Sequence, residues 1–118
     1  CQINCSVNIS GDTQSISDDV ASHLYRIVQE SIKNAHTHGK ADKVEVRIQA
    51  SNGMIDLSIA DNGIGVKELP LGKEEGFGCR SMRYRAESLG GNFVMRRGDG
   101  GGVLIECRIP LRPQNEAS

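Results

Sequence analysis

The chain has 118 residues, 37% of them hydrophobic and 25% charged, which suits one globular domain and is too short for two. A net charge of −1 and 3% aromatic residues argue against a nucleic-acid surface, which needs a basic excess and stacking rings. No apolar run approaches the roughly 18 residues of a membrane span. Because the chain opens on Cys1 without a signal peptide, we expect it to be a piece of a larger protein.

The first predicted element is a strand over residues 3–9, where apolar residues alternate with polar ones as in a half-buried strand. The chain has four cysteines, and none of them form the Cys-x-x-Cys spacing of a metal or redox site. We therefore predict that Cys5 and Cys107, both at apolar strand positions, are small buried residues in a reducing compartment.

A long amphipathic helix is predicted over residues 17–38, because apolar residues recur there every three to four positions. Ser17 is the expected N-cap, and Asp18 and Asp19 fall in the first turn, where the helix dipole favours acids. Gly39 stands just past the end, the usual place of a helix-ending glycine.

Four more strands and a second helix complete the predicted order. The strands are expected at 44–48, 55–59, 93–95 and 103–109, and the helix at 79–89. Asn52-Gly53 predicts a tight hairpin between the first two of these strands. This order predicts an α+β fold, a two-layer sandwich of a mixed, mostly antiparallel sheet with helices on one face. We assign residues 1–111 to this domain and 112–118 to a C-terminal tail.

One side of the long helix carries Glu30, Asn34 and His38, which recur every four residues. Such a row is usually a solvated face. Asn is, however, a poor mid-helix residue because its amide competes for backbone hydrogen bonds. Amide and carboxylate oxygens also suit Mg²⁺ or its waters. We interpret the row as a candidate metal-binding and catalytic face.

Asp61 continues the core-facing parity of the predicted strand at 55–59 and has no obvious internal donor. A simple turn, in which Asp61 bonds nearby backbone amides, remains an alternative. We favour a carboxylate that accepts a hydrogen bond from a ligand amine. Gly63 and Gly65 would then let the backbone approach a flat ring closely.

Gly76-Phe77-Gly78 stands before the second predicted helix, where free amides and the helix dipole favour phosphate. A Gly-x-Gly pair is a weak signal by itself, and this one matches neither the dinucleotide fingerprint nor a Walker loop. Together, the helix face, the strand-end Asp and this loop indicate a purine nucleotide bound with Mg²⁺.

These residues resemble the ATP-binding fold shared by DNA gyrase, heat-shock chaperone ATPases, MutL and sensor histidine kinases. Within it, the chain resembles the catalytic ATP-binding domain of a sensor histidine kinase of the nitrate/nitrite-sensor type. The matching segments are 24–38, 61–65, 76–78, 82–91 and 100–102. Residues 82–91 favour this subgroup over an anti-sigma-type serine kinase, an alternative with the same fold.

The resemblance implies a role for each candidate residue, with ATP and Mg²⁺ as ligands. Asn34 would hold the metal, Glu30 would orient the metal or its water, and Asp61 would bind the adenine amino group. The other candidates would border the adenine ring or the phosphates, and they are Gly63, Gly65, Gly76, Gly78 and His38.

The resemblance further implies a short ATP lid over residues 66–75, with Lys67 and Lys73 as candidate phosphate contacts. Three positions depart from the family pattern: Thr37, Cys79 and Val103. The first replaces a basic residue and the last a threonine. Together these two losses would weaken phosphate binding by about 1–3 kcal/mol if both groups made charge-assisted hydrogen bonds.

The resemblance also implies partners: the protein's own dimerisation and phosphoacceptor domain and a response regulator, but no nucleic acid. We expect a homodimeric parent and a monomeric 118-residue piece that binds ATP without autophosphorylating. The domain is expected to be cytoplasmic, in a parent that can be anchored in the inner membrane. A degenerate nucleotide-binding or interaction module stays open as an alternative, because of Thr37 and Val103.

Overall fold

The computed structural model describes residues 3–37, 40–63, 79–98 and 101–111. Their strands are β1 (Asn4–Gly11), β2 (Lys43–Ser51), β3 (Met54–Asp61), β4 (Asn92–Arg97) and β5 (Val103–Pro110). The helices are α1 (Asp18–Thr37) and α2 (Cys79–Ser88), with a short 3-10 turn, η1 (Thr13–Ser15), between β1 and α1. The predicted element order is confirmed, and the predicted tail at 112–118 lies outside the described residues.

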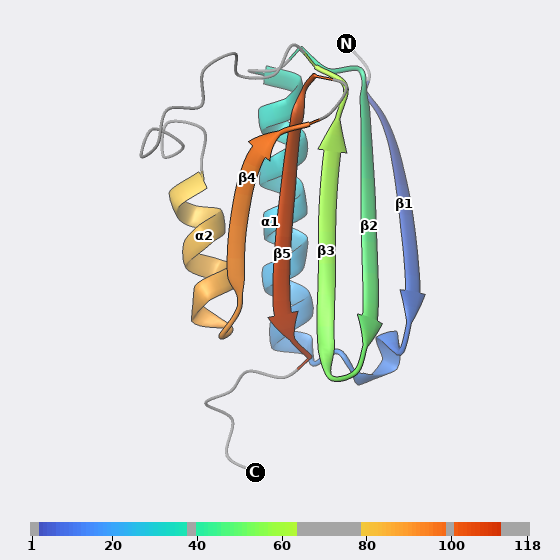
Figure 1. The fold of residues 1–118 in the computed structure, drawn as a ribbon, viewed down its shortest axis with the longest axis vertical. Helices are drawn as coiled ribbons and strands as arrows, with labels where there is room; N and C mark the ends of the chain where they lie inside the picture. Colours follow the sequence, from blue (N-terminus) through green and yellow to red (C-terminus); the bar gives the residue numbers. More distant parts are fainter. Residues whose placement is uncertain (1–2, 38–39, 64–78, 99–100, 112–118) are drawn as a thin grey trace.

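The sheet has the strand order β1-β2-β3-β5-β4 (Figure 1). β1 runs parallel to β2, and the other three pairs are antiparallel. Asn52 and Gly53 join β2 to β3, and their φ angles of 53° and 76° are those of a type I′ hairpin turn. Both helices lie on the same face of the sheet (Figure 1). The predicted α+β sandwich with a mixed, mostly antiparallel sheet is therefore confirmed.

The N-terminus of α1 is capped as its sequence predicts. The Ser17 hydroxyl accepts a hydrogen bond from the backbone N–H of Val20 at 3.2 Å, and Asp18 and Asp19 occupy the first turn. Beyond the C-terminus of α1, the N–H of Ala41 donates a hydrogen bond to the carbonyl of Ala35 at 2.9 Å. Gly39, the predicted helix-ending residue, lies outside the described residues.

The core lies between the helices and the sheet. Its largest fully buried side chains come from both layers and are Ile27, Ile55, Leu57, Met82, Leu89 and Ile109. The buried Ser31 hydroxyl donates to the carbonyl of Ile27 at 2.8 Å and lies 3.3 Å from the Met82 sulfur, which joins α1 to α2. Cys107 is buried as predicted, and this burial raises the pKa of its thiol to about 12.

The prediction of a half-buried β1 with a buried Cys5 is wrong. Every residue of β1 is exposed, Cys5 included. β1 is an edge strand, and Figure 1 shows neither helix behind it. Apolar alternation indicates which residues share a face of a strand, but it does not show whether another element covers that face.

Candidate functional site

Two features singled out from the sequence, the polar row of α1 and Asp61 at the end of β3, belong to one end of the molecule, the upper end in Figure 1. The last turns of α1, the end of β3 and the beginning of α2 all lie there, next to the turn between β4 and β5. Asn34 and Asp61 therefore belong to the same end of the fold. The other candidates, from the end of the helix row, the glycine loops and the lid, fall outside the described residues, and they are His38, Gly65, Lys67, Lys73, Gly76 and Gly78.

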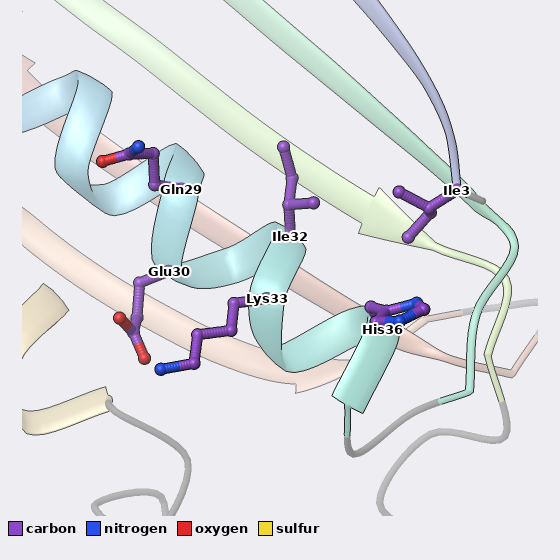
Figure 2. Close-up of a pocket in the computed structure, with 6 residues that line it drawn as sticks. All are labelled: Ile3, Gln29, Glu30, Ile32, Lys33 and His36. Atoms are coloured by element: carbon purple, nitrogen blue, oxygen red, sulfur yellow. The ribbon is translucent and has the colours of Figure 1, made fainter. Parts of the chain in front are cut away.

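Glu30 and Asn34 flank the buried side of α1, which is formed here by Ile27, Ser31 and Ala35. Both flanking residues are half-buried, so neither belongs to a fully solvated face. Glu30 also lines a pocket of about 550 Å³ along the C-terminal half of α1. In Figure 2 its carboxylate points away from the strands that Ile32 faces. The helix thus presents one amide and one carboxylate on the same flank.

The Asp61 carboxylate is oriented by the backbone of two separate segments. Its Oδ1 accepts hydrogen bonds from the N–H of Gly63 at 2.9 Å and from the N–H of Val103 at 3.2 Å. The expectation that Asp61 has no internal donor is therefore wrong, and the turn alternative describes part of the geometry. Both bonds go to the same oxygen, and no described residue donates to Oδ2. Within the described residues, the half-buried carboxylate thus has one oxygen open to a further donor.

Gly102 makes this arrangement sterically feasible. Its φ is +71°, and a Cβ added there would collide with the Asp61 carbonyl oxygen and lie 2.7 Å from Oδ1. Only glycine fits so close to the carboxylate. The Val103 side chain is 9% exposed and joins the core, so its backbone N–H is the part that contacts Asp61. Sequence reasoning noted Val103 because it lacks the hydroxyl of the family threonine, and it did not predict the role of the Val103 backbone N–H.

Asn62 fastens the end of β3 to the beginning of β2. Its side-chain oxygen accepts from the N–H groups of Asp42 at 3.1 Å and Lys43 at 3.0 Å. Its Nδ2 donates to the Asp42 carboxylate at 2.7 Å, and its own N–H donates to the Lys43 carbonyl at 3.1 Å. This set of bonds holds Asp61 and Gly63 in place. Sequence reasoning missed it, and the only signal was an Asn between those two candidates.

The donor set suits a cation that arrives with a nucleotide. No group of three or more His, Cys, Asp or Glu side chains gathers into a metal cluster within the described ranges. Mg²⁺ typically keeps several waters and takes one or two protein oxygens together with substrate phosphates. The Asn34 amide and the Glu30 carboxylate fit that requirement, whereas a purely protein-built cage would need more ligands.

The sequence profile of the family described as "Histidine kinase-, DNA gyrase B-, and HSP90-like ATPase" matches residues 19–113. The chain belongs to this ATPase family. Several characterised proteins similar to the chain are histidine kinases. It is 37% identical to the sensor histidine kinase LiaS of Bacillus subtilis over 112 residues, which cover 93% of this chain and 31% of LiaS. It is 39% identical to the nitrate/nitrite sensor protein NarQ of Escherichia coli over 84 residues, 70% of this chain and 15% of NarQ.

Solved structures agree with this assignment. The Erythrobacter litoralis EL346 blue-light activated histidine kinase matches the ATPase domain with a TM-score of 0.75 and 28% identity, over 96% of this chain and 37% of that one. The ATP-binding domain of PrrB from Mycobacterium tuberculosis shares the fold, with a TM-score of 0.67 and 23% identity over 92% of this chain and 80% of that one. The chain is thus an ATP-binding catalytic domain of the sensor histidine kinase type, and it spans about a third or less of the curated relatives' length. Neither described helix is long and apolar enough to cross a membrane.

Proposed function

We propose that this domain binds Mg-ATP at the upper end of the sheet and supplies the γ-phosphate to a histidine on a separate dimerisation domain of the same kinase. The observation that carries the binding site is the Asp61 carboxylate, whose Oδ1 is held by two amides while Oδ2 receives no bond from the described residues. The transfer step is supported by the similarity to sensor histidine kinases such as LiaS.

Asp61 would read the base through its second oxygen. The amino group of adenine is a donor, so it can bond to a carboxylate that the protein already holds in place. Guanine carries a carbonyl oxygen at the equivalent ring position, and two acceptors facing each other are unfavourable. We therefore infer a preference for ATP over GTP at this site. Gly63, whose N–H holds Oδ1, would border the flat ring on the backbone side.

Asn34 would bind Mg²⁺ at the phosphate end, with Glu30 beside it to orient the metal or its water. When bound, Mg²⁺ neutralises the charge that the phosphate oxygens carry in phosphoryl transfer. The domain's own residues would bind and orient the nucleotide, because this chemistry depends chiefly on positioning and electrostatics. The phosphoryl group would then pass from the histidine to an Asp of a response regulator, in a homodimeric kinase.

The base-reading role of Asp61 predicts a loss of affinity in Asp61→Asn. The amide keeps the shape of the side chain and an acceptor for the two backbone N–H groups, but it presents an NH₂ where the adenine amino group would approach. We expect the affinity for a non-hydrolysable Mg-ATP analogue, measured by calorimetry, to fall about 10- to 100-fold, as for a buried donor left unpaired.

Asp56→Asn is the matched control, because it makes the same change on the same strand. The Asp56 side chain is 57% exposed and lies 3.6 Å from Arg108, a surface ion pair of small energetic value. We expect it to bind the analogue with unchanged affinity. Equal affinity in both variants would contradict the proposed role of Asp61.

Two outcomes would favour the alternative functions instead. If calorimetry detects no heat at millimolar analogue, with or without Asn34→Ala, the domain is a degenerate module. If the domain phosphorylates a serine of a small antagonist protein, the anti-sigma alternative is favoured.

A further inference from the structure

β1 carries a row of apolar side chains on the helix-bearing face of the sheet. Val7 and Ile9 pair in parallel register with Val46 and Ile48 of β2, so each pair shares a face. Val46 is buried beneath the helices at 1% exposure, whereas Val7 and Ile9 are 56% and 57% exposed. The apolar face of the sheet therefore extends one strand beyond the part that the helices cover.

The width of the elements accounts for the uncovered strand. Neighbouring strands are roughly 4.8 Å apart, and a helix with its side chains is roughly 10 Å wide. One helix therefore covers about two strands, and two helices leave about one of five uncovered. In Figure 1, α2 lies beside β4, α1 lies behind β5, and β1 is the strand farthest from both helices.

The flank of α1 forms a second wall beside this row. Val28 and Ile32 are only partly buried, and Tyr25 is 63% exposed. At the upper end, Ile3 and Ile32 line the pocket of about 550 Å³ together with polar residues of α1, His36 among them. Figure 2 shows Ile32 pointing toward the strands, with Ile3 on the neighbouring chain segment. The β1 row and this flank define what we call the α1–β1 groove.

We propose that the α1–β1 groove is the seat of an amphipathic α-helix from the same kinase polypeptide, outside residues 1–118, with an aliphatic stripe and an acidic flank. The match covers 31% of LiaS and 15% of NarQ, so such relatives carry ample chain outside the domain. A helix over β1 would contact the α1 flank as well, as packed helices do.

The charges around the groove set the polarity of that helix. β1 carries no charged residue, so the strand side of the groove favours aliphatic contacts alone. The pocket at the upper end includes Lys33 and His36 on α1, with Glu30 pointing to the other side of the helix from Ile32. Acidic residues on the flank nearest Lys33 would complement its positive charge. This proposal does not depend on nucleotide binding.

A second copy of the chain suits the groove less well. Two β1 edges could pair through their backbones, but such pairing extends the sheet sideways. Val7 and Ile9 would stay exposed, because their side chains stand perpendicular to the plane of pairing. A helix lying across the face buries them directly.

Photo-crosslinking in the full-length kinase tests the proposal. With p-benzoylphenylalanine in place of Val7, irradiation should give adducts within the same polypeptide, outside residues 1–118, recurring every three to four residues along one segment. The same probe in place of Val94, which is 46% exposed on the opposite edge strand, is the matched control and should give none. Three results would each overturn the proposal. The adducts could be confined to residues 1–118 of a second copy, they could join a different protein, or their yield could be no higher than in the Val94 control.

The exposed thiol of Cys5 provides an independent measurement, because it lies in the same row. The other thiols are replaced by serine except Cys107, which is buried and has its pKa raised to about 12, so it does not compete for an alkylating reagent. Cys5 should react at least tenfold more slowly in the full-length kinase than in the 118-residue chain. Equal rates, or protection of the short chain that grows with its concentration, would contradict a helix supplied in cis.

Discussion

Asp61 is held by backbone amides that come from two different parts of the chain, Gly63 beyond β3 and Val103 at the start of β5. Because both amides use Oδ1, the direction of Oδ2 is set before any ligand arrives. A preoriented acceptor loses less conformational entropy on binding than a free side chain does. At the residue scale, the geometry of the main chain orients the one carboxylate on which the candidate site depends.

Gly102→Ala should disturb both stability and binding. Its φ of +71° is unfavourable for alanine, and the new methyl group would meet Asp61. We expect the free energy of unfolding, measured in urea, to fall by about 2 kcal/mol or more. We also expect the affinity for the Mg-ATP analogue to fall about tenfold or more as the carboxylate moves.

Gly53→Ala separates the effect of an unfavourable backbone conformation from that of a steric clash. Gly53 has a φ of +76°, but a Cβ there would meet no atom within 4 Å. The backbone conformation alone should then cost about 1 kcal/mol of stability and leave the affinity unchanged. If Gly102→Ala cost no more than Gly53→Ala and bound the analogue normally, the close approach of Gly102 to Asp61 would have no functional meaning.

α1 is the element that serves the most surfaces. Its central side is buried in the core, one flank carries Glu30 and Asn34, and the other carries Val28 and Ile32. A helix that contributes to three surfaces must be well anchored at its ends. The N-terminal anchor is the Ser17 cap, which lies far along the axis from the candidate site.

Ser17→Ala should therefore weaken the fold without changing the site. Loss of an N-cap typically costs about 1 kcal/mol of unfolding free energy. Asn34 is 17 residues away, about 25 Å along the helix, so analogue affinity should not change. Ser22→Ala, at an exposed position within α1, is the control and should be neutral or slightly stabilising, because Ala is the better helix former. A cap variant as stable as wild type would show that Ser17 does not anchor the helix.

The whole molecule should bind ATP without labelling itself. Its three histidines are His23, His36 and His38, and all lie on or at the end of the predicted ATP-site helix. His23 is also engaged at the helix–helix contact, with Nδ1 3.3 Å from the Arg85 guanidinium. Because all three belong to this predicted helix, we propose that the phosphoacceptor histidine lies on another domain of the kinase.

Incubation with γ-labelled ATP checks this expectation. The 118-residue chain should acquire no acid-labile label under conditions in which the full-length kinase is labelled. Binding of the analogue by the short chain, measured in parallel, shows that the absence of label is not a failure to bind. Stable acid-labile label on the short chain would contradict the separation of ATP site and acceptor.

The sequence by itself determined the order of elements, the α+β sandwich and the kind of site. Hydrophobic period, the Ser17 cap and the Asn52-Gly53 turn are local signals, and each acts over a few neighbouring residues. The positions of Asn34 and Asp61 could be read in the same way, as a helix row and a strand end. Their roles toward Mg²⁺ and adenine remain predictions.

Only the tertiary structure decided what surrounds these residues. The bond from Val103 to Asp61 and the bond from Asn62 to Asp42 join segments that lie far apart in the chain. The exposure of β1 likewise depends on which distant elements cover the sheet. The Asp61–Val103 bond spans 42 positions. No local pattern encodes such a contact, because it depends on how strands order themselves in the sheet and on how far two helices can reach across five strands.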